Sequence, residues 1–496
     1  MNTNKENRRD MKYRLLNIFG LIAIIAMATS CKKEFLDTPS PQPTFEINFS
    51  SADNAELAVV GCYDIMGWDG KHNTIPFFFG DIAGHDTYKG GDVGADQDWM
   101  DNLKNFTYTP DNYMLNFAYT DYYKGVGRSN STIENVGKMS ADLISNKQKA
   151  QFIAEAKFTR SYFYFELVKT FGSVPLIDHI LSVDEYQQPL ASISSIYAFI
   201  EADLTAAISK LPSKTEGGPA YVGRATKGMA QALLAKVYIY QQKWPEAKKM
   251  TDDIIGVGEY SLMSNFADVF NMDYENNDEI IFSIQFKESA NGEYGNDNEG
   301  SMLEVYLTAR NAPFAGIGGW GFSCPTKDLY DEFEAGDIRR DATIISNGDT
   351  LWKGTPDEQV FTLNFATNKD HLSNRKYALP RSQQPAEMSD ASKNWIVIRY
   401  ADVLLWNAEA AFHMGGDWHT PLNEIRTRAG LGATTLTGID AIYHERRVEL
   451  ALEGDRFWDV VRQGQGDAVL GKYGYMEGVH NHFPIPQAQL DLSDLW

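Results

Sequence analysis

Cysteine and histidine are scarce in this chain. It has three cysteines and nine histidines in 496 residues. Three cysteines cannot build the disulfide framework of a small secreted domain, and so few histidines leave little material for a histidine-rich metal site. We therefore predict neither a metal site nor a cofactor.

Basic residues are also in deficit. The chain has 45 Lys+Arg against 67 Asp+Glu, a formal charge of −22. This balance argues against a nucleic-acid partner, because binding to phosphates needs a basic surface. Intrinsic disorder is excluded as well, since 43% of the residues are hydrophobic and 12% are aromatic. The composition is that of a large, acidic, aromatic-rich globular protein.

Long hydrophobic runs are confined to the N-terminus. An apolar run at 15–28 follows Met11-Lys12-Tyr13-Arg14, and it is short for a membrane span but typical of a secretory signal peptide. It ends at Ala28-Thr29-Ser30-Cys31, which resembles a bacterial lipobox with Cys31 as the lipidated residue. We predict a lipoprotein signal peptide at 1–30, an extended Pro-rich tether at 31–45 and one compact unit at 46–496, with parts 46–225 and 226–496. The protein is then anchored to a membrane without crossing it.

Catalytic motifs are missing. His444-Glu445 is not followed by a second zinc-ligating histidine, and the chain has no P-loop, no Gly-x-Ser-x-Gly elbow and no Cys-x-x-Cys pair. The sequence motifs therefore give no positive support for catalysis. A glycoside hydrolase stays open, because two carboxylates that flank a glycosidic bond leave no sequence signature.

Two local features leave alternatives open. Cys62 and Cys324 are either buried thiols, which we favour, or one disulfide. The segment 291–301 is rich in oxygen ligands suited to calcium, but its spacing does not fit an EF-hand. We favour a flexible polar loop there.

Helical periodicity dominates the rest of the chain. Between about 265 and 395 it fails, apart from a strand-like run at 279–284. Small residues and a Pro at the start of the second helix make 226–255 a tetratricopeptide-type hairpin. We predict a mostly α fold, a tetratricopeptide-like helix-pair scaffold (α-α superhelix) with long irregular loops and a few short strands. The expected helices lie in the 50s and at 113–138, 149–171, 194–211, 226–255, 399–414 and 439–463.

The last of these expected helices carries an ordered charge pattern. Four charged residues recur at helical spacing and so fall on one face, where positive and negative charges alternate in part. They are Arg446, Glu449, Glu453 and Arg456. Such a face is either an anion site or a network of ion pairs that holds the helix to its neighbours. We favour the network, because side chains that are already paired have no free charge or hydrogen-bond donor left for a ligand.

Several segments together resemble the SusD/RagB family of Bacteroidetes outer-membrane lipoproteins. They occur in family order over nearly the whole mature chain. They are Cys31 followed by Phe35-Leu36-Asp37 and prolines; 155–168 running into Phe171-Gly172-Ser173-Val174-Pro175-Leu176; 226–238; 398–405 with Glu409-Ala410; 422–431; the charged segment 445–464; and Phe483-Pro484-Ile485-Pro486.

The resemblance implies a function at the cell surface. It implies a non-catalytic, exterior-facing lipoprotein of the outer membrane that binds oligosaccharides and delivers them to a SusC-like TonB-dependent transporter. On this ground we predict that the protein is not an enzyme. RagB-type members are linked to peptides instead, so peptide capture is an alternative. A surface glycoside hydrolase is the other.

The ligand site is expected where exposed aromatic rings meet short polar side chains. Sugar rings stack on Trp and Tyr through their C–H faces, and their hydroxyls need polar partners. Two loop regions, 68–102 and 294–322, have this composition. The candidates for ligand binding are Trp68, Tyr88, Asp98, Trp99, Asn102, Tyr306, Arg310, Trp320 and Phe322.

Overall fold

The computed structural model describes residues 48–68, 75–92, 96–289, 299–310, 319–363, 368–387 and 390–495. Phe49–Trp496 form one compact unit. Cys31, the expected signal peptide and tether, and most of the 291–301 loop lie outside the described residues. No helix among the described residues combines the length and the apolar character that crossing a membrane requires.

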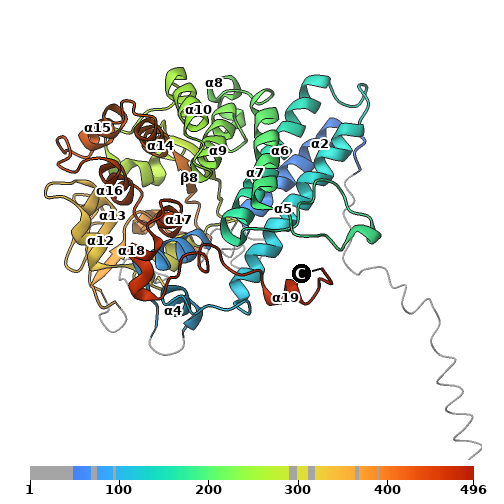
Figure 1. The fold of residues 1–496 in the computed structure, drawn as a ribbon. Coiled ribbons are helices and arrows are strands. Elements are labelled where there is room, and N and C mark those ends of the chain that lie inside the picture. Colours follow the sequence, from blue (N-terminus) through green and yellow to red (C-terminus); the bar gives the residue numbers. More distant parts are fainter. Residues whose placement is uncertain are drawn as a thin grey trace, which may run out of the picture. The chain divides into compact units, whose positions relative to one another are not determined.

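Helices make up most of the unit, as predicted (Figure 1). The α-helices are α2 (Ala52–Asp64), α4 (Asp98–Lys104), α5 (Tyr113–Lys138), α6 (Asn146–Phe171), α7 (Ile193–Ile208), α8 (Lys214–Gly217), α9 (Lys227–Tyr240), α10 (Trp244–Val257), α11 (Leu303–Leu307), α12 (Lys327–Glu332), α13 (Arg339–Thr343), α14 (Tyr400–His413), α15 (His419–Arg428), α16 (Ile439–Glu449), α17 (Arg456–Arg462), α18 (Gly466–Leu470) and α19 (Gln487–Leu490). A π-helix, η3 (Pro76–Ile82), and the short 3₁₀ helices η6 (Phe266–Phe270), η7 (Met272–Tyr274) and η8 (Arg381–Gln383) lie between them.

Successive long helices pack as neighbours. Helix α6 lies between α5 and α7, and α9 and α10 form the predicted hairpin, with α14 packed on α10 (Figure 1). The small residues Ala230, Ala232 and Ala235 of α9 are fully buried, which permits close approach of the next helix. Helix α6 begins earlier than expected, at Asn146, because the Ser145 side chain accepts a hydrogen bond from the backbone N–H of Gln148.

A glycine sets the spacing of α5 and α6. A Cβ at Gly125 would lie 2.3 Å from the Phe163 ring, whereas a Cβ at Gly127, on the same helix, would meet nothing within 4 Å. We expect Gly125→Ala to lower the free energy of unfolding by about 1–3 kcal/mol through overpacking. Gly127→Ala should raise it by about 0.5–1 kcal/mol, because alanine is the better helix former. Urea denaturation of both variants checks this, and equal effects would contradict it.

The strands form four two-stranded antiparallel sheets. They pair as β1 (Thr87–Gly90) with β3 (Phe322–Pro325), β2 (Ile280–Ile284) with β8 (Trp395–Arg399), β4 (Ile344–Ser346) with β7 (Leu372–Asn374), and β5 (Thr350–Leu351) with β6 (Gln359–Val360). Strand β2 matches the predicted run at 279–284. The stretch where periodicity failed thus holds short strands and short helices, and its strands β2 and β3 pair with segments distant in sequence.

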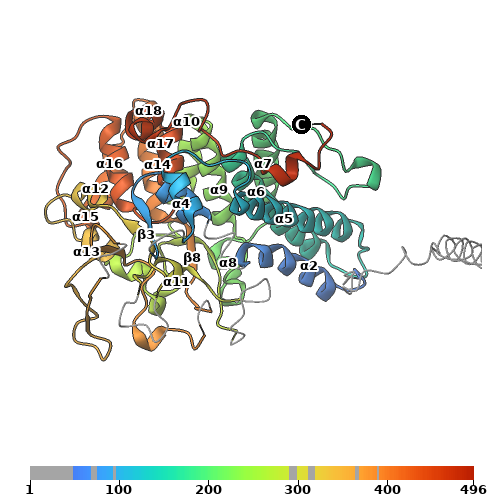
Figure 2. The same ribbon diagram turned by 90° about the horizontal axis from the view of Figure 1, so that it is seen from below.

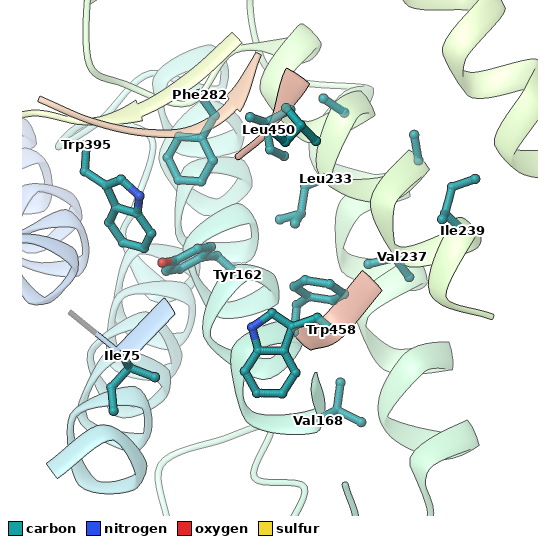
Figure 3. Close-up of a cluster of buried hydrophobic side chains, with 14 of the residues drawn as sticks. Ile75, Tyr162, Val168, Leu233, Val237, Ile239, Phe282, Trp395, Leu450 and Trp458 are labelled. Atoms are coloured by element: carbon teal, nitrogen blue, oxygen red, sulfur yellow. The ribbon is translucent and has the colours of Figure 1, made fainter. Parts of the chain in front are cut away.

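The main core joins the helical scaffold to the β2–β8 sheet. Figure 3 shows Phe282 of β2 and Trp395 of β8 above Tyr162 of α6, with Trp458 of α17 near Val168. Phe282 and Tyr162 meet edge to face at 5.6 Å between ring centroids. Rings on the expected packing helices, Phe163, Tyr164 and Trp458, are buried, so these aromatics are core residues.

The predicted single helix at 439–463 is wrong. Helix α16 ends at Glu449 and α17 starts at Arg456. Between them the backbone enters the left-handed region at Leu452 (φ 64°) and Gly454 (φ 94°). A Cβ on Gly80 would lie 1.8 Å from the Gly454 carbonyl oxygen, so this turn packs directly on η3. Glu449 and Arg456 therefore do not share one continuous helical face.

The favoured ion-pair network is nevertheless confirmed. Arg399 is fully buried, and its guanidinium contacts Glu279 at 2.7 Å, Glu449 at 2.5 Å and Glu453 at 2.9 Å. Burial raises the pKa of Glu449, but the surrounding arginines outweigh it and hold that pKa well below its usual value. The network continues through Arg428 to Glu279 and Glu449, Arg339 to Glu445 and Glu449, and Arg426 to Glu445. It ties α16 to the β2–β8 sheet and to α13 and α15.

The thiols follow the favoured alternative. Cys62 and Cys324 are free and buried, and no disulfide joins them. Burial raises the pKa of both thiols, so they remain protonated and unreactive at neutral pH.

Candidate functional site

The pairing of β1 with β3 builds the frame of the candidate site. It places Tyr88 opposite Cys324 and Gly90 opposite Phe322. Gly90 (φ 69°) and Gly321 (φ 68°) both adopt left-handed backbone, and a Cβ on Gly90 would lie 2.2 Å from the Gly321 carbonyl oxygen. Only glycine permits this approach, which joins the two loop regions singled out in the sequence.

Aromatic rings from four segments gather on this frame. Tyr306 of α11 and Trp320 meet edge to face at 4.9 Å between centroids. Phe78 of η3 contacts Tyr306 at 5.6 Å and Trp99 of α4 at 5.7 Å. Figure 2 shows α4, β3 and α11 grouped near the middle of the view. We call Trp99, Tyr306 and Trp320 the aromatic cluster.

The aromatic cluster is a partly exposed surface over a buried floor. Phe78 and Phe322 are 1% and 4% exposed, whereas Trp99, Tyr306 and Trp320 are partly exposed. Rings held by a buried floor lose little freedom when a ligand stacks on them. The three rings therefore offer apolar surface at a low entropic cost.

Charged side chains stand beside the rings. Arg310 contacts Asp92 at 3.0 Å and Asp96 at 3.7 Å, and its guanidinium also donates to the Trp320 carbonyl oxygen at 3.4 Å. All three of these charged side chains are more than a quarter exposed. Together they supply donors and acceptors of the kind that sugar hydroxyls require.

Helix α4 adds a polar rim. Gln97 precedes it with φ 57°, and its Oε1 accepts hydrogen bonds from Trp99 Nε1 at 2.5 Å and from the Tyr113 hydroxyl at 2.9 Å. Two predicted residues of α4, Asp98 and Asn102, are exposed. The Asp98 carboxylate lies 3.7 Å from Lys89 Nζ, and Asn102 Oδ1 accepts from the Thr107 hydroxyl.

Tyr88 lies below this surface. It is 6% exposed, its hydroxyl donates to Asn368 Oδ1 at 3.0 Å, and its ring lies 4.8 Å from Lys369 Nζ. Burial raises the pKa of its hydroxyl. Its contacts bind β1 to the segment before β7, which makes it part of the frame.

Trp68 is placed elsewhere. Its indole N–H donates to Asp64, and Lys124 and Arg128 of α5 each lie 5.0 Å from its ring. Trp99 contacts Tyr113 at the start of the same helix. Eleven residues of α5 separate Tyr113 from Lys124, about 16 Å of helix. Trp68 therefore does not join the aromatic cluster.

Phe78, Gln97, Asp92 and Asp96 contribute to the site but were not among the predicted candidates. They belong to the same Gly-, Asp- and aromatic-rich stretch that drew attention to Trp99. The composition of this stretch indicates a binding loop, but it does not indicate that the π-helix η3 brings Phe78 into contact with Trp99 and Tyr306.

A buried acid lies on the same short helix as one member of the aromatic cluster. Glu304, on the same helix as Tyr306, is 8% exposed, and its Oε2 has no hydrogen-bond partner among the described residues. Burial is the main cause that raises the pKa of this carboxyl from 4.5 to about 8. Glu304 is therefore largely protonated in the folded protein at neutral pH.

This raised pKa makes stability depend on pH. Between pH 4.5 and 8 the unfolded chain loses the Glu304 proton while the folded chain keeps it, so this group lowers the free energy of unfolding as pH rises. The loss is up to about 4 kcal/mol. We expect Glu304→Gln to be more stable than the parent at pH 8 and similar to it at pH 4.5. Urea denaturation at both pH values measures this, and a gain that is equal at both would contradict it.

Comparison with known proteins shows which family the chain resembles. Residues 278–494 match the sequence model of the SusD family, and residues 82–239 match a model described as starch-binding associating with outer membrane. SusD-like protein P25 of Formosa agariphila is 28% identical over 97% of both chains. Starch-binding protein SusD of Bacteroides thetaiotaomicron is 24% identical, over 79% of this chain and 80% of its own. The chain is thus similar to SusD/RagB-family proteins over most of its length.

Solved structures agree with this similarity. A laminarin binding SusD-like protein has a TM-score of 0.79 and 28% identity, covering 90% of this chain and 98% of its own. Surface glycan-binding protein A from Bacteroides thetaiotaomicron, in complex with laminarihexaose, has a TM-score of 0.78 and 25% identity, covering 89% and 97%. The fold is therefore the tetratricopeptide-like helical fold of SusD-like proteins, as predicted. These relatives are named as binding proteins and not as enzymes.

Proposed function

We propose that this protein binds oligosaccharides on the aromatic cluster without altering them. The observation that carries the proposal is the cluster itself: Trp99, Tyr306 and Trp320 come from three segments and stand beside the charged group of Arg310. A flat ring takes the C–H face of a sugar, and the arginine and its carboxylates bind hydroxyls. Named glycan binders among the relatives support the same ligand class.

The proposal includes a place in the cell. Cys31 is the lipid attachment site, and the anchored protein stands on the outer membrane beside a SusC-like TonB-dependent transporter, to which it delivers the oligosaccharide. The lipobox-like sequence and the description of the second family as associating with outer membrane support this. Palmitate labelling of the full chain and of Cys31→Ala tests the anchor: the parent should incorporate label, and label retained in Cys31→Ala would contradict it.

Titration calorimetry tests the binding. The chain from residue 32 onward contains the whole compact unit Phe49–Trp496. It should bind at least one of laminarihexaose and maltohexaose, and mass spectrometry after long incubation should return the oligosaccharide intact. Release of shorter sugars would show a glycoside hydrolase instead. Binding of peptides with no sugar bound would favour the RagB-type alternative.

A further inference from the structure

A cavity lies apart from the aromatic cluster. Its volume is about 330 Å³, and it shares no lining residue with that cluster. Most of its lining comes from three segments: η6 and η7, the loop between β5 and β6, and the stretch 375–383. Ala342 and Lys393 complete it. Its volume falls at the lower end of the range for small-molecule sites.

Hydrogen bonds between the enclosing segments fix the walls of this cavity. The backbone N–H and the hydroxyl of Ser382 donate to the two carboxylate oxygens of Asp357, at 3.0 and 2.6 Å. Gln383 donates to Asp273 of η7 at 2.9 Å. The loop between β5 and β6 is thus bonded to η8, and η8 is bonded to η7. The cavity is a built feature and not a gap between loose loops.

An aromatic residue with unusual backbone lines one wall. Trp352 adopts φ 49°, a left-handed conformation that is rare for a bulky residue. Thr355 holds this turn, donating its backbone N–H and its hydroxyl to the Trp352 carbonyl oxygen at 3.1 and 2.7 Å. Residues held in such conformations occur preferentially at ligand sites.

Two cations lining the cavity donate hydrogen bonds to backbone carbonyl oxygens. Arg375 donates to the carbonyl oxygen of Asp341, and Lys393 donates to that of Phe270 at 2.6 Å. Within the part of the chain that the structure describes, neither forms an ion pair. By contrast, Lys376, the third cation of the lining, is paired with Glu453 at 2.6 Å. Burial lowers the pKa of Lys393 to about 8, although the nearby carboxyl groups of Glu275 and Glu304 act to raise it.

We propose that this cavity binds an acidic sugar unit, with Trp352 against its ring and Arg375 and Lys393 at its anionic group. The planar guanidinium of Arg375 can donate two parallel hydrogen bonds to the oxygens of a carboxylate or a sulfate ester. Asp268 and Asp273 line the cavity from η6 and η7 and accept hydrogen bonds from the sugar hydroxyls. A carboxylate and a sulfate ester share the chemistry that this site recognises.

Ligand-observed NMR titrations test the proposal. The probes are glucuronic acid, glucose 6-sulfate and neutral glucose, and the protein carries Trp320→Ala so that the aromatic cluster is disabled. At least one anionic probe should bind at least tenfold more tightly than glucose. Arg375→Gln should weaken the binding of the anionic probe at least tenfold and leave the affinity for glucose unchanged. Comparing the affinities for glucuronic acid and glucose 6-sulfate shows which of the two anionic groups the site accepts.

Arg381→Gln is the matched control, since Arg381 is exposed, lies six residues away and does not line the cavity. It should leave all three affinities unchanged. Trp352→Ala should weaken the binding of the anionic probe and of glucose alike. Thermal melting confirms that this variant is folded. Failure of both anionic probes to bind, equal binding of glucose, or an equal loss in Arg381→Gln would overturn the proposal. None of these outcomes bears on oligosaccharide binding at the aromatic cluster.

Discussion

Replacing Arg399 with methionine should lower the free energy of unfolding by about 3 to 5 kcal/mol. The substitution removes the cation shared by Glu279, Glu449 and Glu453 and leaves these carboxylates buried without it. Glu279 and Glu449 are fully buried, so water cannot replace the lost partner. Urea denaturation followed by circular dichroism measures the loss.

Arg340→Met is the matched control for this substitution. Arg340 is 35% exposed and pairs with Asp341, which is 73% exposed. An exposed pair contributes little, so the control should change stability by less than about 1 kcal/mol. Similar losses in the two variants would show that the buried network has no special role in holding α16 to the β2–β8 sheet.

Trp320→Ala should weaken oligosaccharide binding roughly 10- to 100-fold, which corresponds to about 1.4 to 2.8 kcal/mol. The substitution removes one face of the aromatic cluster and the ring that packs edge to face on Tyr306. Stability should change little by comparison, because the buried floor of Phe78 and Phe322 remains. Titration calorimetry with the tighter of laminarihexaose and maltohexaose measures the effect.

Trp418→Ala controls for loss of a partly exposed tryptophan. Trp418 stacks on His419 at 3.7 Å between centroids and belongs to neither sugar site. Its replacement should leave the affinity unchanged. An equal loss in both variants, or full affinity in Trp320→Ala, would argue against the aromatic cluster as the binding surface.

The helical scaffold could be predicted because its signals are local. Apolar spacing and the Pro at the start of α10 fix helices without knowledge of their partners. The break after Glu449 was missed because the charge spacing suits one helix. After the helix the chain turns through left-handed backbone at Leu452 and Gly454, and Gly454 packs against η3, a segment far away in the sequence.

The candidate site could be predicted only in part. Its two loop regions were marked by composition, and the structure brings Trp99, Tyr306, Arg310 and Trp320 together from them. Composition could not show that Tyr88 is buried or that Trp68 lies farther along α5, because both placements depend on long-range pairing. The cavity at Trp352 was not foreseen, since η6, η7, the loop between β5 and β6, and the stretch 375–383 meet there only in the fold.

A crystal structure of the chain from residue 32 onward with its tightest-binding oligosaccharide tests the central claim most directly. We expect a sugar ring against Trp99 or Trp320 with its hydroxyls within hydrogen-bond distance of Arg310. The glycosidic bonds should be intact. An oligosaccharide bound away from Trp99, Tyr306 and Trp320 would contradict the account.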